Sequence, residues 1–217
     1  MDRPVGAPLS LLAGALLVVS AAAVHPHVEG DGPAQLSIMA ASAAWHAIHW
    51  AFLFGFVLCL AGLAGVASRY RGTAGEPAAV TGTVVAAFAY AAWLVIVAFM
   101  AGSGATLADT YRQADPGLTG TRAVFLYDMV RPFALVAQRV AAFALGITTL
   151  LFGWALLRSG RDPRWLGWMG LIAGFAGVAL ALAYSEATRA DQVAFVLPVL
   201  WQVAAGVTFL AVRPAAG

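Results

Sequence analysis

All four histidines of this chain fall within residues 25–49, between two long apolar runs. Two of them, His46 and His49, are three residues apart, a spacing that puts side chains at neighbouring positions on one face of a helix. Neutral imidazole is the commonest protein ligand for zinc and copper, and carboxylates can complete such a site. The sequence therefore predicts a zinc or copper site in this stretch. Its candidate ligands are His25, His27, His46 and His49, with Glu29 and Asp31 close behind.

The same histidines allow three other interpretations. A b-type haem would take one histidine after the first apolar run, His25 or His27, and one from the second run, His46 or His49. Against haem, two histidines on one helix face cannot approach an iron from opposite sides. A pH sensor is the second alternative, because imidazoles beside carboxylates gain charge between about pH 7 and 5. Ordinary interfacial residues are the third, since no HExxH motif, repeated histidine box or cysteine cluster accompanies them.

A second group of polar residues borders the later apolar runs. Ionisable groups near a membrane are costly unless they pair or meet water, and they are therefore candidates for function. We expect a polar cavity that binds a lipid headgroup, a quinone or a small anion. The simpler alternative is an interfacial salt bridge between Arg139 and an acidic partner. The candidate ligand-binding residues are Asp128, Gln138, Arg139 and Glu186.

The composition is that of a membrane protein. Of the 217 residues, 62% are hydrophobic and 10% are charged, whereas a soluble domain has roughly 25% charged residues. Too few polar groups remain to cover a water-facing surface, so lipid must be the main solvent. The net charge of +2 and the lack of a basic motif argue against a nucleic-acid partner. All twelve basic residues are arginine, which excludes lysine Schiff bases, and the single cysteine, Cys59, cannot form an internal disulfide.

Six apolar runs are long enough to cross a bilayer, which takes about 20 residues. They predict an all-α bundle of six transmembrane helices in one domain over residues 1–217. We interpret the first run as a span and not as a signal peptide, because it exceeds the usual hydrophobic region of about 7–15 residues. Residues 102–131 are predicted to form a longer polar connection with room for a short surface helix. The spans are predicted at residues 5–24, 43–67, 78–101, 133–157, 165–184 and 193–212.

An even number of spans places both termini on one side of the membrane. Seven arginines fall on that side and five on the other. The short loops determine orientation best, and they favour cytoplasmic termini. The chain is then a multi-pass protein of the cytoplasmic (inner) membrane, with its histidines on the extracytoplasmic side. Aromatic residues near the span ends, such as Trp45 and Trp50, are predicted to be interfacial anchors. The bilayer itself and other membrane subunits are the candidate partners.

The turn between the fourth and fifth predicted spans has a distinctive pattern, made by Arg158, Ser159, Gly160, Pro163, Leu166 and Gly167. A His25-Pro26 pair follows the first span, and a histidine, His46 or His49, lies early in the second. These features resemble a broad set of uncharacterised bacterial six-span membrane proteins, including a family known only as a domain of unknown function. The resemblance covers most of the chain and implies six helices with both ends inside the cell. It implies no activity and no functional residues.

From the sequence alone we predict an accessory or small-ligand-binding membrane subunit with a polar, histidine-containing extracytoplasmic face. The alternative is a metal- or haem-dependent membrane redox protein that uses the four histidines. Whether the histidine side chains converge distinguishes the two. Transport is disfavoured, because transporters carry polar groups near mid-bilayer, whereas the middles of these spans are almost entirely apolar. The sequence predicts no catalytic residue.

Overall fold

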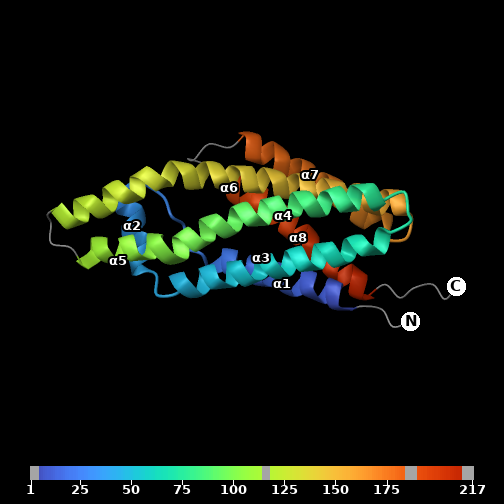
Figure 1. The fold of residues 1–217 in the computed structure, drawn as a ribbon, viewed down its shortest axis with the longest axis horizontal. Helices are drawn as coiled ribbons and strands as arrows, with labels where there is room; N and C mark the ends of the chain where they lie inside the picture. The colour runs from blue at the N-terminus through green and yellow to red at the C-terminus, as the bar shows by residue number, and fades with distance from the viewer. Residues whose placement is uncertain (1–4, 114–117, 184–189, 212–217) are drawn as a thin grey trace.

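The computed structural model describes residues 5–113, 118–183 and 190–211, and every regular element in these ranges is helical. Within these ranges, six helices are long and apolar enough to cross a membrane, which confirms the predicted all-α six-span bundle. The start of α1 and the end of α8 lie at the same end of the molecule, hereafter the terminal end (Figure 1). In chain order the elements are α1 (Gly6–Val24), α2 (Gly32–Ala41), α3 (Trp45–Ala67), the 3-10 turn η1 (Ser68–Tyr70), α4 (Glu76–Phe99), the π turn η2 (Met100–Gly104), α5 (Ala105–Gln113), α6 (Leu118–Ser159), α7 (Arg164–Ala183) and α8 (Ala190–Ala211).

Two of the six spans are much longer than a bilayer is thick. The path through α4, η2 and α5 has 38 residues, and α6 has 42. At 1.5 Å per residue they measure about 57 and 63 Å, compared with about 30 Å for the hydrocarbon core. Both meet α3 or α7 through short turns at the terminal end, so their excess length extends from the opposite end. Figure 1 shows α5 and the first part of α6 reaching past α1 and α3, with α2 between them.

This projecting end (α2, η2, α5 and the first part of α6) corrects one expectation. Residues 102–131 were predicted to be a polar connection, but α5 and α6 continue as helices through most of it. They do so because α2 packs against both and supplies a second hydrophobic core, separate from that of the bundle. A helix persists in water when one of its faces is covered in this way. The buried members of this core are Leu36, Met39, Trp45, Ala105, Ala108 and Tyr127.

Within the bundle, α1 and α3 are in close contact through glycines. A Cβ added to Gly14 would lie 2.6 Å from the backbone nitrogen of Cys59, and one added to Gly62 would lie 2.5 Å from that of Leu11. The α6–α7 pair is equally close, since a Cβ on Gly153 would lie 2.8 Å from a backbone oxygen of α7. Small residues allow transmembrane backbones to approach, which is how helices without a hydrophobic driving force gain packing energy.

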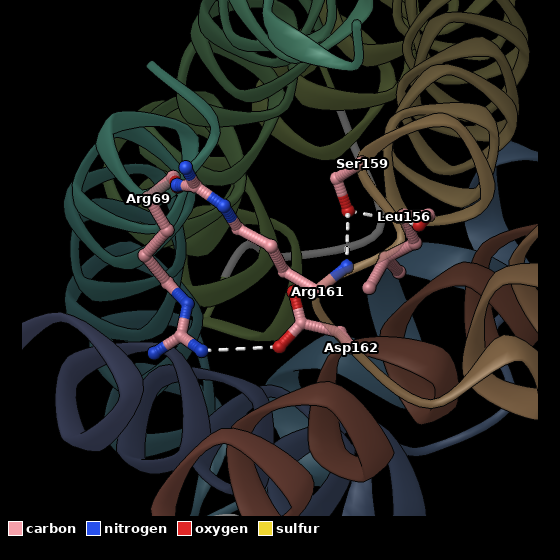
Figure 2. A network of polar contacts seen from close by, with 5 residues as sticks. All are labelled: Arg69, Leu156, Ser159, Arg161 and Asp162. Atoms are coloured by element: carbon pink, nitrogen blue, oxygen red, sulfur yellow. Dashed lines mark hydrogen bonds and ion pairs between the residues drawn. The ribbon is translucent and has the colours of Figure 1, made fainter. Parts of the chain in front are cut away.

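A polar network closes the terminal end (Figure 2). Arg69 in η1 donates from Nη2 to Oδ1 of the buried Asp162 at 3.0 Å, and Arg161 donates from Nη1 to the backbone oxygen of Arg69 at 2.9 Å. The α6–α7 turn is itself shaped by Ser159, whose Oγ accepts from the backbone N–H of Arg161, and by Gly160, whose φ is +64°. Glycine favours this left-handed conformation after a helix. The turn that carries the sequence motif therefore also fastens α7 to the end of α3.

Candidate functional site

Trp45, the first residue of α3, joins the projecting end to the bundle. Its side chain is buried, and its indole Nε1 donates to the backbone oxygen of Met100 at 2.8 Å. Met100 begins the π turn η2, a departure from the α-helical pattern that is frequent at functional sites. The prediction that Trp45 is an interfacial anchor was therefore wrong, whereas Trp50 is 53% exposed, as an anchor would be. Trp45 instead contacts the rings of His25 and His49 and borders a cavity at the projecting end.

His25 and His49 form a pair of imidazoles against the Trp45 ring. The centroids of the two imidazoles are 5.3 Å apart, and those of Trp45 and His49 are 4.3 Å apart. Each Nδ1 lies 2.7 Å from a backbone oxygen, that of Pro26 for His25 and that of Trp45 for His49. Because a carbonyl oxygen only accepts, each Nδ1 carries the hydrogen and each neutral ring keeps its lone pair on Nε2. Metal-binding histidines are oriented by this kind of hydrogen bond.

The pKa of His25 supports the neutral form. Burial lowers this pKa from its ordinary value of 6.5, because the charged imidazolium loses its hydration. The hydrogen bond to the Pro26 oxygen raises the pKa, and the nearby His27 lowers it, but burial has the largest effect. At neutral pH the His25 ring is therefore an uncharged donor at Nδ1 and a free acceptor at Nε2.

The other two histidines point elsewhere. His46 is exposed, because a three-residue step turns a helix by about 300° and leaves it about 60° from the buried His49. His27 is half-buried, with Nε2 at 3.2 Å from Glu29 Oε2 and Nδ1 accepting from Gln192 Nε2 of α8 at 3.1 Å. Across the described ranges, no group of three or more His, Cys, Asp or Glu side chains is arranged to hold a metal ion. The structure thus brings two of the four predicted ligands together.

A cavity of about 370 Å³ opens at the projecting end, between the α2–α3 connection and α5. Its charged groups are Asp109 and Arg112, which form an ion pair at 3.1 Å, and both side chains are more than half exposed. His46 adds an imidazole, and the buried Trp45 also borders the cavity. The cavity therefore offers a carboxylate, a guanidinium and an imidazole. The full lining consists of residues 39–43, Trp45, His46, Ala105, Asp109 and Arg112.

Asp128, a predicted ligand-binding residue, lies against the start of α2. A Cβ added to Gly32 would be 2.5 Å from Asp128 Oδ1, so only glycine allows this approach. Arg131 donates from Nη1 to the backbone oxygen of Gly30 at 3.1 Å, and Asp31 caps α2 by accepting a backbone N–H of its first turn at 3.0 Å. Carboxylates at a helix N-terminus are stabilising. Asp128 and Asp31 thus help to hold α2 in place.

Two other predicted ligand-binding residues, Gln138 and Arg139, do not join Asp128. Gln138 and Arg139 are half-buried, farther along α6. Arg139 is separated from Asp128 by about 16 Å of helix rise, which is too far for a direct ion pair. Glu186 lies outside the described residues. The structure therefore does not assemble the predicted cavity from Asp128 and Arg139, and the cavity it does show lies between α2, α3 and α5.

Sequence reasoning missed the two charged residues that line this cavity. Asp109 and Arg112 belong to α5, and a helix over residues 105–113 places them at i and i+3 on one face. The sequence predicts this segment only as a polar connection with room for a short surface helix, so it does not pair the two residues. Asp162 was also missed, although it is the one acidic residue in a turn with three arginines, at positions 158, 161 and 164. A single acidic residue among several arginines indicates an ion pair, and the sequence does contain this signal.

A family model described as "Domain of unknown function (DUF4386)" matches residues 7–212. The match confirms the resemblance to a domain family of unknown function that the short motifs indicated. No curated protein and no solved structure matches the chain. Roles for individual residues therefore have to come from the geometry above.

Proposed function

Since the chain belongs to DUF4386, a domain family of unknown function, we propose a role from its own geometry. It is a multi-pass membrane protein that binds a small polar molecule at its projecting end. Its termini are cytoplasmic, so the projecting end faces the extracytoplasmic side of the cytoplasmic membrane. The positive-inside rule supports this orientation, because the turns at the terminal end are short and rich in arginine. These arginines are Arg69, Arg71, Arg158, Arg161 and Arg164.

The cavity beside Trp45 carries the proposal. Its volume of about 370 Å³ is within the range of small-molecule sites, roughly 300–1,000 Å³. The Asp109–Arg112 pair is exposed, and such pairs contribute about 0–1 kcal/mol, so each group can exchange its partner for a ligand at little cost. A carboxylate beside a guanidinium matches a zwitterion that carries an ammonium group and a carboxylate. His46 supplies one further polar contact to such a molecule.

A thermal-shift experiment in detergent tests this assignment. The probes are the free amino acids and small betaines, added to the purified chain and to an Asp109→Asn/Arg112→Gln variant. We expect at least one probe to raise the Tm of the parent chain and to lose that effect in the variant. Gln113→Ala is the matched control, because this exposed residue is on the same helix as Asp109 and Arg112 but not in the cavity wall. A panel without any shift, or a shift that survives the double substitution, would contradict the proposal.

The His25–His49 pair supports a second candidate, a metal site with two protein ligands. The Nδ1 hydrogen bonds leave both Nε2 lone pairs available, as in metal-binding histidines. Two imidazoles suit Cu(I), which accepts two ligands, better than Zn²⁺, which takes about four. A haem b does not suit the pair. The two rings are in edge contact at 5.3 Å with Trp45 and Phe52 beside them, which leaves no room for a macrocycle between them.

Elemental analysis and an absorption spectrum of the purified chain test the second candidate. A His25→Ala/His49→Ala variant is compared with His27→Ala/His46→Ala, which removes the two histidines that point away. Stoichiometric copper that is lost only in the first variant would establish the pair as a metal site. Metal-free protein after growth and purification with added copper, or equal loss in both variants, would eliminate it.

A further inference from the structure

An apolar stripe runs along one face of α6 and has no partner in the described chain. Its members recur at intervals of three, four or seven residues, which places them within an arc of about 80° on the helix. Five of them are more than 60% exposed, far more than large apolar residues of a water-facing helix need to be. The α6 stripe consists of Leu118, Phe125, Met129, Phe133, Val136 and Val140.

Lipid can cover only part of the α6 stripe. Measured from Ser159 at the terminal end, the helix rise places Phe133 at about 39 Å and Met129 at about 45 Å. Leu118 is about 62 Å away by the same measure. The hydrocarbon core is about 30 Å thick, and the whole bilayer with its headgroups about 40–45 Å. The outer half of the stripe therefore lies in water, where an exposed apolar surface of this length marks an interaction site.

We propose that the α6 stripe is the surface through which two copies of this chain pair. The steps of three, four or seven residues keep the members of the α6 stripe on one face, as the seam of a parallel two-helix coil requires. The membrane inserts both copies in the same direction, so a two-fold axis along the membrane normal brings the α6 stripes together in parallel. The exposed surface of the six side chains is on the order of 700 Å² per copy, close to the roughly 800 Å² per partner of a stable interface.

Arg122 gives the pairing a distinctive electrostatic feature. It is exposed and lies on the α6 stripe between Leu118 and Phe125. In a parallel two-fold pair it faces its own copy, and a single basic residue in such a seam costs stability. Replacing Arg122 by leucine should therefore strengthen the pair, whereas a different subunit with an acidic residue at this level would bind less well to the variant. The sign of this one change separates self-pairing from pairing with another subunit.

Cysteine crosslinking of the full chain in native membranes tests the proposal. The background is Cys59→Ala, which removes the one native thiol. Met129→Cys puts a thiol on the α6 stripe, and Thr119→Cys is the matched control, exposed on the same helix but about 80° around it. After copper-phenanthroline oxidation we expect a product of twice the chain mass from Met129→Cys, at least five-fold more abundant than from Thr119→Cys. Equal yields, or a product of any other mass, would overturn self-pairing.

Light scattering after size exclusion in a mild detergent provides a second readout. Met129→Glu should convert the dimer to a monomer at protein concentrations where Thr119→Glu leaves it intact, and circular dichroism should show both variants folded. Arg122→Leu should lower the dissociation constant at least three-fold. A dimer that withstands Met129→Glu, or one that Arg122→Leu weakens, would show that the copies do not meet through the α6 stripe. If detergent alone separates the copies, the crosslinking in membranes decides.

Discussion

Replacing Asp162 by alanine should destabilise the bundle by about 2 kcal/mol, a value that follows from the burial of its ion pair. The Asp162 side chain is 2% exposed and its Oδ1 lies 3.0 Å from Nη2 of Arg69, whose side chain is 27% exposed. The substitution leaves this guanidinium without its carboxylate. Removal of one partner from a fully buried pair costs about 3–5 kcal/mol, because the other charge remains desolvated and unpaired.

Two features of Arg69 reduce that cost. Its side chain keeps about a quarter of its surface in solvent, so the unpaired charge regains part of its hydration. Its guanidinium carbon also lies 4.8 Å from the centroid of the Phe209 ring on α8, an attraction of about 0.5–1 kcal/mol that survives the substitution. These two effects bring the expected loss down to about 2 kcal/mol.

The assay is reversible unfolding in mixed micelles of dodecyl maltoside and SDS, followed by circular dichroism. Asp162→Asn keeps the side-chain volume and an oxygen acceptor, so we expect about half the loss of Asp162→Ala. A double-mutant cycle with Arg69→Met isolates the pair, and its coupling energy should be about 1–2 kcal/mol. The reasoning fails if Asp162→Ala unfolds within about 0.5 kcal/mol of the parent chain, or if the coupling energy is close to zero.

Two further predictions concern helix packing and pH. Gly14→Ala should lower the free energy of unfolding by about 1–3 kcal/mol, because the added Cβ would lie 2.6 Å from the Cys59 backbone nitrogen. The control Gly6→Ala should be neutral, because a Cβ at Gly6 has nothing within 4 Å. Equal unfolding midpoints for both variants would contradict the packing argument. Burial lowers the pKa of His25 from 6.5, so just below pH 6.5 the folded chain binds fewer protons than the unfolded chain. The free energy of unfolding therefore keeps its full value above pH 6.5 and declines as the pH falls below it. Chelator-treated His25→Gln should therefore lose less stability than the parent chain between about pH 7 and 5, and an equal loss would show that His25 is not responsible.

The six spans could be predicted because the requirement that lipid places on a span can be read from consecutive residues alone. Backbone groups inside a bilayer must be satisfied within the helix, so about 20 apolar residues in a row are sufficient evidence for a span. The family resemblance also came from local sequence, in the turn around Arg158 and Pro163. Neither argument applies outside the bilayer, where water satisfies the backbone of a loop and a helix equally well. That is why residues 102–131 were interpreted as a connection and not as continuations of α4 and α6.

At the candidate site, too, the sequence predicted some features and not others. Its residue types were visible in the sequence, since His25, His46 and His49 stand out in an apolar chain. Their partners were not, because a rotation of about 60° on α3 separates a side chain packed in the bundle from one that faces α5. Asp109 and Arg112 line the cavity only because α2 packs against α5 and keeps it helical at the projecting end. The sequence by itself thus determined the solvent, the spans and the chemical groups, whereas tertiary packing alone decided which groups meet, because packing selects one direction for each side chain.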